Sequence, residues 1–372
     1  MRYRRMVMEA ESPEEFGYER IRCNLAESSL SDAVLDALGI DLAGLVLLYG
    51  DHSGLPGLRE VVAAQAGGVG PDDVLITAGS AMALFIVATA LLEPGDHLVV
   101  ARPNYATNIE TPRAIRCETS YLDLTFEERY AVDPARIEAL MTPRTRLISL
   151  TCPHNPTGTM MNEATFQRVV ELAEERGAVL LVDETYREMT YARPLPLAAS
   201  LSRGAISVAS LSKAYGMPGI RVGWLICRDP SLRETFLAAK EQIMLTGSVV
   251  DETIASQVLA RRDRWLPTLR LKMNDGLGIT RAWMAAQPDL EWVEPAGGVV
   301  CFPRVRSDVS VDLDRFYRIL LDDLATFVGP GHWFEQSRRH MRIGFGWPTL
   351  ERLEEGLANI SRALERARLP AT

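Results

Sequence analysis

A series of short apolar runs between residues 73 and 227 constrains the fold more than any other feature of the sequence. The runs DVLITAG, HLVVARP, CETSYLDL, TRLISLTCP, AVLLVDE, AISVASL and VGWLIC are rich in Val, Ile and Leu, and helical segments such as 80–92 and 164–177 lie between them. Several runs lack polar alternation, as expected for strands that are covered on both faces. The pattern predicts an α/β domain with a mainly parallel sheet flanked by helices.

The length of 372 residues favours one large domain and one smaller domain. After Pro230 the sequence changes to long amphipathic helices, and the last part has α+β character, with a hairpin expected around Gly297 and Gly298. We expect an N-terminal arm (1–40) that packs with the small domain, a large domain (41–275) and a smaller C-terminal domain (276–372). Within the arm, Ser31 or Asp32 is expected to cap a short helix that ends at Gly39.

Composition and charge exclude several classes of partner. The net charge is −9, and acidic and basic residues are mixed along the chain, which argues against a nucleic-acid or anionic membrane surface. The five cysteines have no C-x-x-C spacing and the five histidines form no i, i+4 pair, so we expect free thiols and no structural metal. Neither a signal peptide nor a membrane span is recognisable, and a cytoplasmic protein that binds small molecules and copies of itself is expected.

Polar residues follow several of the predicted strands, where open α/β sheets bind their ligands. Lys213 lies among small hydroxyl residues just after one apolar run, and this set suits a phosphate beside a nucleophilic amine. The start of the helix at Gly79 offers free N–H groups to an anion. The candidate residues at the strand ends are Gly79, Ser80, Ala81, Tyr105, Asn155, Asp183, Tyr186, Ser210, Ser212, Lys213 and Arg221.

Each candidate also has an ordinary structural interpretation. A single lysine in a loop is usually a solvated cation, Gly79 and Ser80 suit a simple helix cap, and Asn155 before a proline is typical of a turn. Arg221 and Arg342 would ordinarily lie on the surface, but both are embedded in apolar strand sequence, where an unpaired charge is costly. The coincidence of these residues at one edge of the sheet favours the functional interpretation.

From about Tyr49 to the C-terminus, the chain resembles the class I/II aminotransferases of fold type I, the pyridoxal 5′-phosphate (PLP) enzymes related to aspartate aminotransferase. The motifs that carry the resemblance are Y-x4-G-x3-LR at 49–59, HNPTG at 154–158, D-x-x-Y at 183–186, SLSK at 210–213 with an arginine eight residues after the lysine, P-x-GG at 295–298, and Arg342. The resemblance implies a large PLP-binding domain with a mainly parallel sheet and a smaller α+β domain.

The resemblance also implies a role for each residue. Lys213 would hold the cofactor aldehyde as a Schiff base and then move the Cα proton, and Asp183 would keep the pyridine nitrogen protonated. Tyr105 would stack on the cofactor ring, while Asn155 and Tyr186 would bond its phenolate oxygen. Gly79, Ser80, Ala81, Ser210, Ser212 and Arg221 would form the phosphate site, and Arg342 would bind the substrate α-carboxylate together with Asn155.

In this family the residue that matches Tyr49 reaches the cofactor phosphate of the neighbouring subunit, so a homodimer with shared active sites is implied. The chain departs from the family near its N-terminus, where NLAESS (24–29) replaces an L-x-x-G-E-P type of segment that closes over the substrate. Glu27 and Ser28 in this segment, with Asp51 and His52 after Tyr49, are candidate substrate contacts. Their negative charge favours a cationic, arginine-type amino acid over aspartate; alternatively, Glu27 caps a turn and Asp51 is solvated.

Transamination of an L-amino acid with a 2-oxo acid is the expected reaction. The same residues also serve elimination, replacement, cyclisation or oxidation, because PLP is an electron sink for all of them. Several motifs look most similar to a branch that includes capreomycidine-synthase-like cyclases of antibiotic pathways, which act on hydroxylated arginine by elimination and ring closure. A non-enzymatic regulator built on the same domain is a third reading, but Lys213 is present and no basic extension precedes residue 20.

Overall fold

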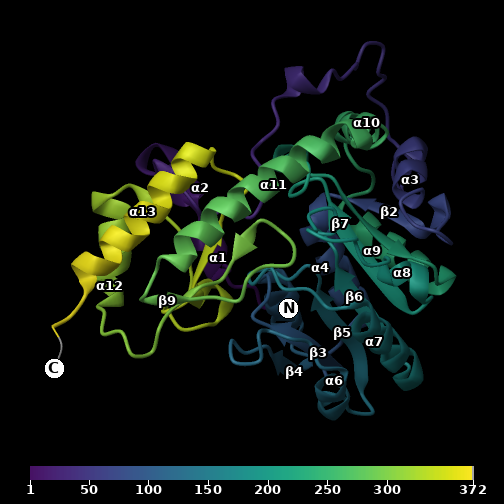
Figure 1. Ribbon diagram of the computed structural model, residues 1–372. Coiled ribbons are helices and arrows are strands. Elements are labelled where there is room, and N and C mark those ends of the chain that lie inside the picture. The colour runs from purple at the N-terminus through teal and green to yellow at the C-terminus, as the bar shows by residue number, and fades with distance from the viewer. Residues whose placement is uncertain (371–372) are drawn as a thin grey trace.

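A seven-stranded sheet forms the centre of the larger part of the molecule in the computed structural model, which describes residues 1–370 (Figure 1). Its strands follow the order β2-β8-β7-β6-β5-β3-β4, and β8 alone runs antiparallel to its neighbours β2 and β7. The prediction of a mainly parallel sheet is therefore confirmed. The strands are β2 (Val74–Thr77), β3 (His97–Arg102), β4 (Glu118–Asp123), β5 (Thr145–Thr151), β6 (Val179–Asp183), β7 (Ala205–Ser210) and β8 (Gly223–Cys227).

Both faces of this sheet are covered by helices. Successive residues of a strand point to opposite faces, so Leu98 and Val100 of β3 pack in one apolar cluster with α4, α5 and α9, while Val99 and Ala101 pack in another with α6 and α7. This two-sided burial explains why the strands lack polar alternation. The helices of this part are α3 (Pro56–Ala63), α4 (Gly79–Leu91), α5 (Thr107–Ile115), α6 (Pro134–Leu140), α7 (Glu163–Arg176), α8 (Ala198–Leu201), α9 (Pro230–Ile243) and α10 (Val249–Leu259).

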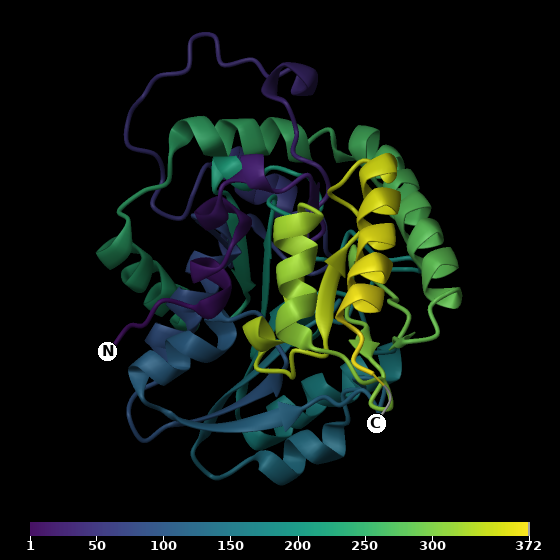
Figure 2. The same cartoon turned by 90° about the vertical axis from the view of Figure 1, so that its left-hand side faces the viewer.

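The C-terminal part is smaller and is joined to the sheet part by the long helix α11 (Arg262–Ala285), which lies beside α13 (Leu350–Ala367) (Figure 2). Here β14 (Met341–Gly344) pairs antiparallel with β10 (Val300–Cys301) and β13 (Gly329–Pro330), and it carries Arg342. The remaining elements are β9 (Leu290–Glu291), β11 (Arg304–Val305), β12 (Thr326–Phe327) and α12 (Leu313–Arg318). The exact division of the chain into domains stays a prediction.

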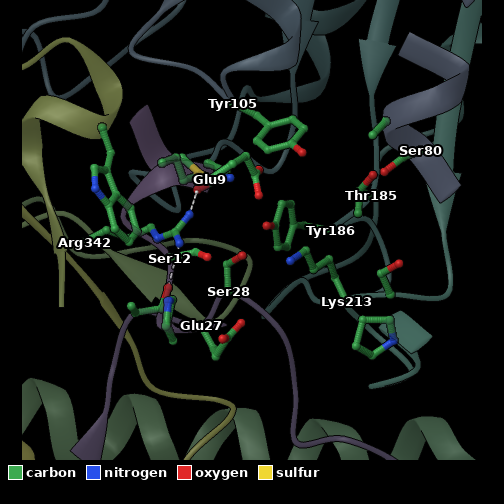
Figure 3. Close-up of a pocket in the computed structure, with 18 of the residues that line it drawn as sticks. Glu9, Ser12, Glu27, Ser28, Ser80, Tyr105, Thr185, Tyr186, Lys213 and Arg342 are labelled. Atoms are coloured by element: carbon green, nitrogen blue, oxygen red, sulfur yellow. Dashed lines mark hydrogen bonds between the residues drawn. The ribbon is translucent and has the colours of Figure 1, made fainter. Parts of the chain in front are cut away.

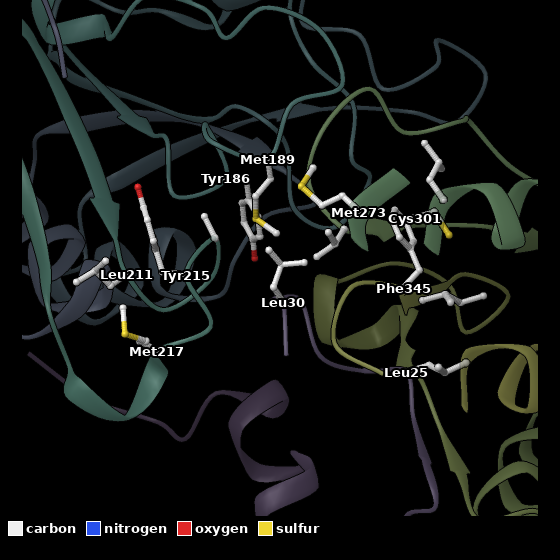
Figure 4. Packing of buried hydrophobic residues seen from close by; sticks show 14 of the residues in the cluster. Leu25, Leu30, Tyr186, Met189, Leu211, Tyr215, Met217, Met273, Cys301 and Phe345 are labelled. Carbon is white, nitrogen blue, oxygen red and sulfur yellow. The ribbon is translucent and has the colours of Figure 1, made fainter. Parts of the chain in front are cut away.

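The N-terminal arm crosses between the two parts. It contains α1 (Val7–Ala10), α2 (Pro13–Phe16) and β1 (Cys23–Asn24), and β1 pairs in parallel with β12 of the C-terminal part. Farther along, Leu30 N–H donates to the backbone carbonyl of Lys213 at 3.1 Å. Figure 4 shows Leu30 between the buried side chains of the sheet part and those of the C-terminal part, so one apolar cluster includes all three segments.

One expectation about local structure is wrong. Ser31 and Asp32 cap no helix; the turn that ends at Gly39 is a short 3₁₀ helix (Leu35–Leu38) without a side-chain cap, and Asp32 accepts from Trp347 Nε1 instead. The hairpin expected around Gly297 and Gly298 is present as a wide one, because β9 pairs antiparallel with β11, Leu290 with Val305 and Glu291 with Arg304. At its centre, the N–H groups of Gly297 and Gly298 donate to the carbonyls of Gly158 and Met189, which ties this segment to the sheet part.

All five cysteines are free thiols, four of them buried and Cys117 partly exposed. Within residues 1–370, no helix is long and apolar enough to cross a membrane. The same range contains no group of three or more His, Cys, Asp or Glu side chains arranged to hold a metal ion.

The fit between β8 and the start of α4 gives a first prediction. A Cβ added to Gly223 of β8 would lie 2.5 Å from the carbonyl carbon of Gly79 and 2.6 Å from the nitrogen of Ser80, both backbone atoms that cannot move aside independently. We expect Gly223→Ala to lower the free energy of unfolding in urea by about 1–3 kcal/mol. Gly278→Ala in α11, where nothing lies within 4 Å, is the control and should be neutral or slightly stabilising. Equal stability of the two variants would contradict this packing.

Candidate active site

The carboxyl ends of several strands, the arm and β14 enclose a cavity of about 350 Å³ (Figure 3). Most of the residues predicted from the sequence meet there, although they come from positions more than 300 residues apart. The predicted residues that line it are Glu27, Ser28, Ser80, Ala81, Tyr105, Asn155, Asp183, Tyr186, Ser212, Lys213, Arg221 and Arg342. Gly79 and Ser210 lie directly beside this lining, at the start of α4 and the end of β7.

Lys213 follows β7 and reaches into the cavity, with its amino group near Tyr186 and Ser28 in Figure 3. Burial lowers the pKa of its ammonium group, and the negative charge of Glu27 opposes this shift. The chain has three lysines. The other two bind backbone carbonyls elsewhere, Lys240 that of His52 and Lys272 that of Trp347, so Lys213 is the amine that this cavity offers.

Asp183 ends β6 and is buried at the bottom of the cavity. Its Oδ1 accepts hydrogen bonds from the N–H and hydroxyl of Thr185, at 3.1 and 2.6 Å. Burial raises the pKa of the Asp183 carboxyl, while the bonds from Thr185 and the charge of Lys213 act in the opposite direction. A positively charged group bound beside Asp183 would therefore be stabilised strongly, because the carboxylate is poorly solvated.

Arg342 enters the cavity from β14 with only 4% of its surface exposed. Its Nη1 donates to Asn155 Oδ1 at 3.0 Å and its Nη2 to the carbonyl of Ala26 at 2.6 Å. Its Nε is buried without a hydrogen-bond partner anywhere in residues 1–370. A buried guanidinium with a free donor is costly unless an anion binds it, and a carboxylate is the group that its planar fork matches best.

The start of α4 faces Arg221 across a narrow gap. The N-cap residue Ala78 provides no side-chain cap, and a Cβ on Gly79 would clash with the Arg221 guanidinium. Arg221 Nη1 also donates to Ser212 Oγ at 3.3 Å, and Ser210 Oγ is buried with no partner in the described part of the chain. Helix N–H groups, a guanidinium and two hydroxyls in one place suit a phosphate group.

Two tyrosines complete the wall around Lys213. Burial raises the pKa of both Tyr105 and Tyr186 to about 12, so both phenols stay protonated at neutral pH and remain able to donate. Tyr186 lies near Ser28, which is itself buried in the arm.

Three further predicted residues, Tyr49, Asp51 and His52, lie away from the cavity of their own chain. Tyr49 is 79% exposed. Asp51 binds Arg59 and the N–H of Ser53, and His52 binds Glu241, so neither offers its side chain to this cavity as residues 1–370 form it. The expectation that Asp51 and His52 supply negative charge to the pocket is therefore not supported within one chain.

The sequence reasoning missed several lining residues. Glu9, Ser12 and Glu14 come from α1 and α2, and Trp333 comes from the turn after β13. The helices α1 and α2 have four residues each and carry no periodic pattern, so nothing in the sequence marked the carboxylates that they bring to the cavity. The one available signal was the expectation that the arm packs beside the small domain.

The comparisons with known proteins agree with this geometry. Residues 23–360 match the family model described as aminotransferase class I and II. The chain belongs to this family. Its cofactor is pyridoxal 5′-phosphate, and the cavity fits that group: the buried Ser210 hydroxyl and the start of α4 suit its phosphate, and Lys213 suits its aldehyde.

Among the relatives of this aminotransferase-family chain, the capreomycidine synthase of Streptomyces vinaceus is 32% identical over 87% of this chain and 82% of its own length. The arginine–pyruvate transaminase of Pseudomonas aeruginosa is 29% identical, with 80% and 77% covered. Among solved structures, a PLP-dependent aminotransferase from Streptococcus suis superposes with a TM-score of 0.91 at 27% identity over both full chains. The PLP-dependent cyclase OrfR follows with a TM-score of 0.88 at 28% identity over 99% of each chain.

His154 holds the loop that carries Asn155, and it gives a prediction about pH. Its Nε2–H donates to the Pro103 carbonyl at 2.9 Å, and in the neutral ring its Nδ1 accepts from Thr157 Oγ1 at 2.7 Å. Burial lowers the pKa of His154 to about 4. In the unfolded chain the His154 ring binds a proton near pH 6.5, whereas in the folded chain it does so only near pH 4. The contribution of His154 to the free energy of unfolding is therefore complete above pH 6.5, and about 3 kcal/mol of it is lost as the pH falls to 4.

We therefore expect the free energy of unfolding of His154→Gln to depend less on pH than that of the wild type. The two denaturation profiles should converge between pH 6.5 and pH 4, since glutamine can keep both hydrogen bonds but binds no proton. Parallel profiles over this range would show that His154 is not held neutral.

Proposed function

We propose that this chain transfers the α-amino group of an L-amino acid of arginine type to a 2-oxo acid. One observation carries the proposal: the Lys213 amine shares a cavity with Asp183 and Arg342. The Nε of Arg342 has no hydrogen-bond partner within residues 1–370 and can bind a carboxylate. Among residues 1–370, no other lysine lines that cavity, and Lys240 and Lys272 bind backbone carbonyls elsewhere.

Bound PLP supplies a carbonyl carbon that bonds to amines and a ring that takes up the electron pair left at Cα. In the proposed arrangement, Ser80, Ala81, Ser210, Ser212 and Arg221 bind its phosphate, Asp183 faces its ring nitrogen, Tyr105 faces the ring, and Asn155 and Tyr186 face its phenolate oxygen. This assignment rests on the burial and position of these residues and on the matching family motifs. The PLP site would then lie in the proposed large domain (41–275).

The chain's own groups then have separate tasks. Arg342 holds the substrate α-carboxylate, which fixes the Cα–H bond relative to Lys213. Lys213 Nζ removes the proton from Cα and returns a proton during the second half of the reaction. Its lowered pKa suits this task, because a neutral amine is needed to accept a proton.

Elimination or cyclisation of an arginine-type amino acid in antibiotic metabolism is the second candidate. Two observations favour it: the 32% identity to a protein named capreomycidine synthase and the TM-score of 0.88 to a protein described as a PLP-dependent cyclase. The cavity residues serve either reaction, so the fate of the amino group decides between them.

We also propose that two copies of the chain form the active unit. The segment before α3 loops away from the rest of the molecule in both ribbon views (Figures 1 and 2). It contains consecutive apolar residues that are exposed. Val46, Leu47, Leu48 and Tyr49 are 66%, 77%, 61% and 79% exposed. A continuous apolar stretch of this kind is typical of an interface. Tyr49 would then reach the cofactor phosphate of the partner subunit.

Transfer of the amino group is tested with L-arginine labelled with ¹⁵N at its α-amino group and with pyruvate as acceptor. We expect ¹⁵N-alanine from the PLP-loaded wild-type protein. Lys213→Ala should lose the visible absorbance of the bound cofactor and reduce alanine formation by at least about 1,000-fold. Lys272→Ala is the matched control, since Lys272 lies outside the cavity lining. Consumption of arginine without labelled alanine would support the second candidate and contradict amino-group transfer.

Shared active sites are tested by mixing two inactive variants. In a mixture of Lys213→Ala and Tyr49→Ala subunits, a mixed dimer has one site with neither change if Tyr49 acts on the partner. Random exchange should then restore about a quarter of the wild-type sites. If Tyr49 acts within its own chain, or if the protein is a monomer by sedimentation, no activity returns.

A further inference from the structure

The N-terminal arm brings three carboxylates to the cavity. Glu9 lies on α1, Glu14 on α2 and Glu27 just after β1, and all three line the same space as Lys213. Figure 3 shows Glu9 and Glu27 together with Lys213. The Glu27 backbone lies against Gly344 of β14, where an added Cβ would clash with the Glu27 carbonyl oxygen. Glu27 is therefore held against the C-terminal part of the molecule and does not lie on a free loop.

The electrostatic environment of these carboxylates depends on Lys213. Burial raises the pKa of Glu27, and the charges of Lys213 and Arg342 oppose that rise. Partial burial also acts to raise the pKa of Glu14, but hydrogen bonds, including those with Ser12 and Tyr18, and the charge of Lys213 lower it overall. Lys213 and Arg342 are thus the cations that face the carboxylates of the arm.

Every cation of this cavity already has a task in the proposed reaction. Arg221 binds phosphate, Arg342 binds the α-carboxylate of the substrate, and the Lys213 amine reacts with carbonyl carbon. The Asp183 carboxylate pairs with the protonated ring nitrogen of the cofactor. Within residues 1–370, the carboxylates of Glu9, Glu14 and Glu27 keep no cation of their own once substrate is bound. Glu9 and Glu14 are exposed at the edge of the cavity, but Glu27 is partly buried, and a poorly solvated carboxylate without a counter-charge is costly.

Glu14 and Glu27 also line a second cavity of about 430 Å³ that adjoins the first at Lys213 and Pro218. Its wall contains two aromatic residues, Tyr18 and Trp347, and a further carboxylate, Asp32, which accepts from Trp347 Nε1 at 3.0 Å. The remaining wall is largely apolar and includes Leu38 and Ile254. Apolar walls suit an aliphatic stem, and aromatic faces with carboxylates suit a guanidinium or ammonium group.

We propose that Glu14 and Glu27, at the junction of the two cavities, form the subsite for the positively charged end of the substrate side chain. This proposal rests on the function proposed above and deepens it. The α-carboxylate binds Arg342, the side chain extends past Lys213, and its cationic group lies between the two glutamates with the second cavity beyond it. The arm, and not the sheet, then selects the substrate by its charge.

L-Arginine and L-citrulline provide the test, because they have nearly the same shape and differ in the charge of the terminal group. With the PLP-loaded full chain, we measure the dissociation constant of each amino acid from the visible absorbance of the cofactor, and KM and kcat from the product. We expect the wild type to bind arginine at least about 30-fold more tightly than citrulline. Glu14→Gln and Glu27→Gln should each reduce this preference about tenfold by weakening arginine alone.

Glu15→Gln is the matched control, because Glu15 is the next residue in α2 but binds Arg5 outside the cavity. It should leave both dissociation constants unchanged. Equal binding of arginine and citrulline by the wild type would overturn the subsite, and so would Glu14 and Glu27 variants that keep the full preference or weaken both amino acids equally. If no amino acid changes the absorbance of the bound cofactor, the proposed function itself fails, which is a different result from a loss of charge selectivity.

Discussion

Burial of charged groups around one cavity is the constraint on which the rest of this structure depends. Lys213, Asp183 and Arg342 are withdrawn from solvent, and the pKa shifts of all three have burial as their largest cause. A folded chain keeps such groups only where bound ligands or neighbouring charges compensate them. Asp183 and Lys213 lie at the carboxyl ends of the parallel strands β6 and β7, and β14 of the C-terminal part brings Arg342 to the same place. The site therefore exists only where the two parts of the molecule meet.

The N-terminal arm turns this cavity into a selective one. Its backbone bonds at Leu30 and its strand β1 connect the Lys213 loop to the C-terminal part, and its carboxylates face the substrate side of the cavity. Because β1 pairs with β12, movement of the C-terminal part relative to the sheet would carry the arm with it. The same segment thus contributes to the apolar core through Leu25 and Leu30 and to the site through Glu27.

Much of the fold and of the cofactor site was predictable from the sequence, since strands that are buried on both faces leave apolar runs and ligands bind where such runs end. Lys213, Asp183 and Asn155 were found in this way, and the helix at Gly79 begins where it was expected. Long-range placement was not predictable. Asp51 and His52 looked like pocket residues because they follow Tyr49, yet their side chains bind Arg59 and Glu241. Glu9 and Glu14 lie in single-turn helices, whose position depends on tertiary contacts such as that of Glu11 with Trp333.

The identity of the lysine that bonds to the cofactor tests the central claim most directly. The PLP-loaded protein is reduced with borohydride, digested, and its peptides are analysed by mass spectrometry. With three lysines in the chain, the modified position can be assigned without ambiguity. We predict a phosphopyridoxyl group on Lys213 alone. A group on Lys240 or Lys272, or a reduced protein without any modified lysine, would contradict the assignment of this cavity as the active site.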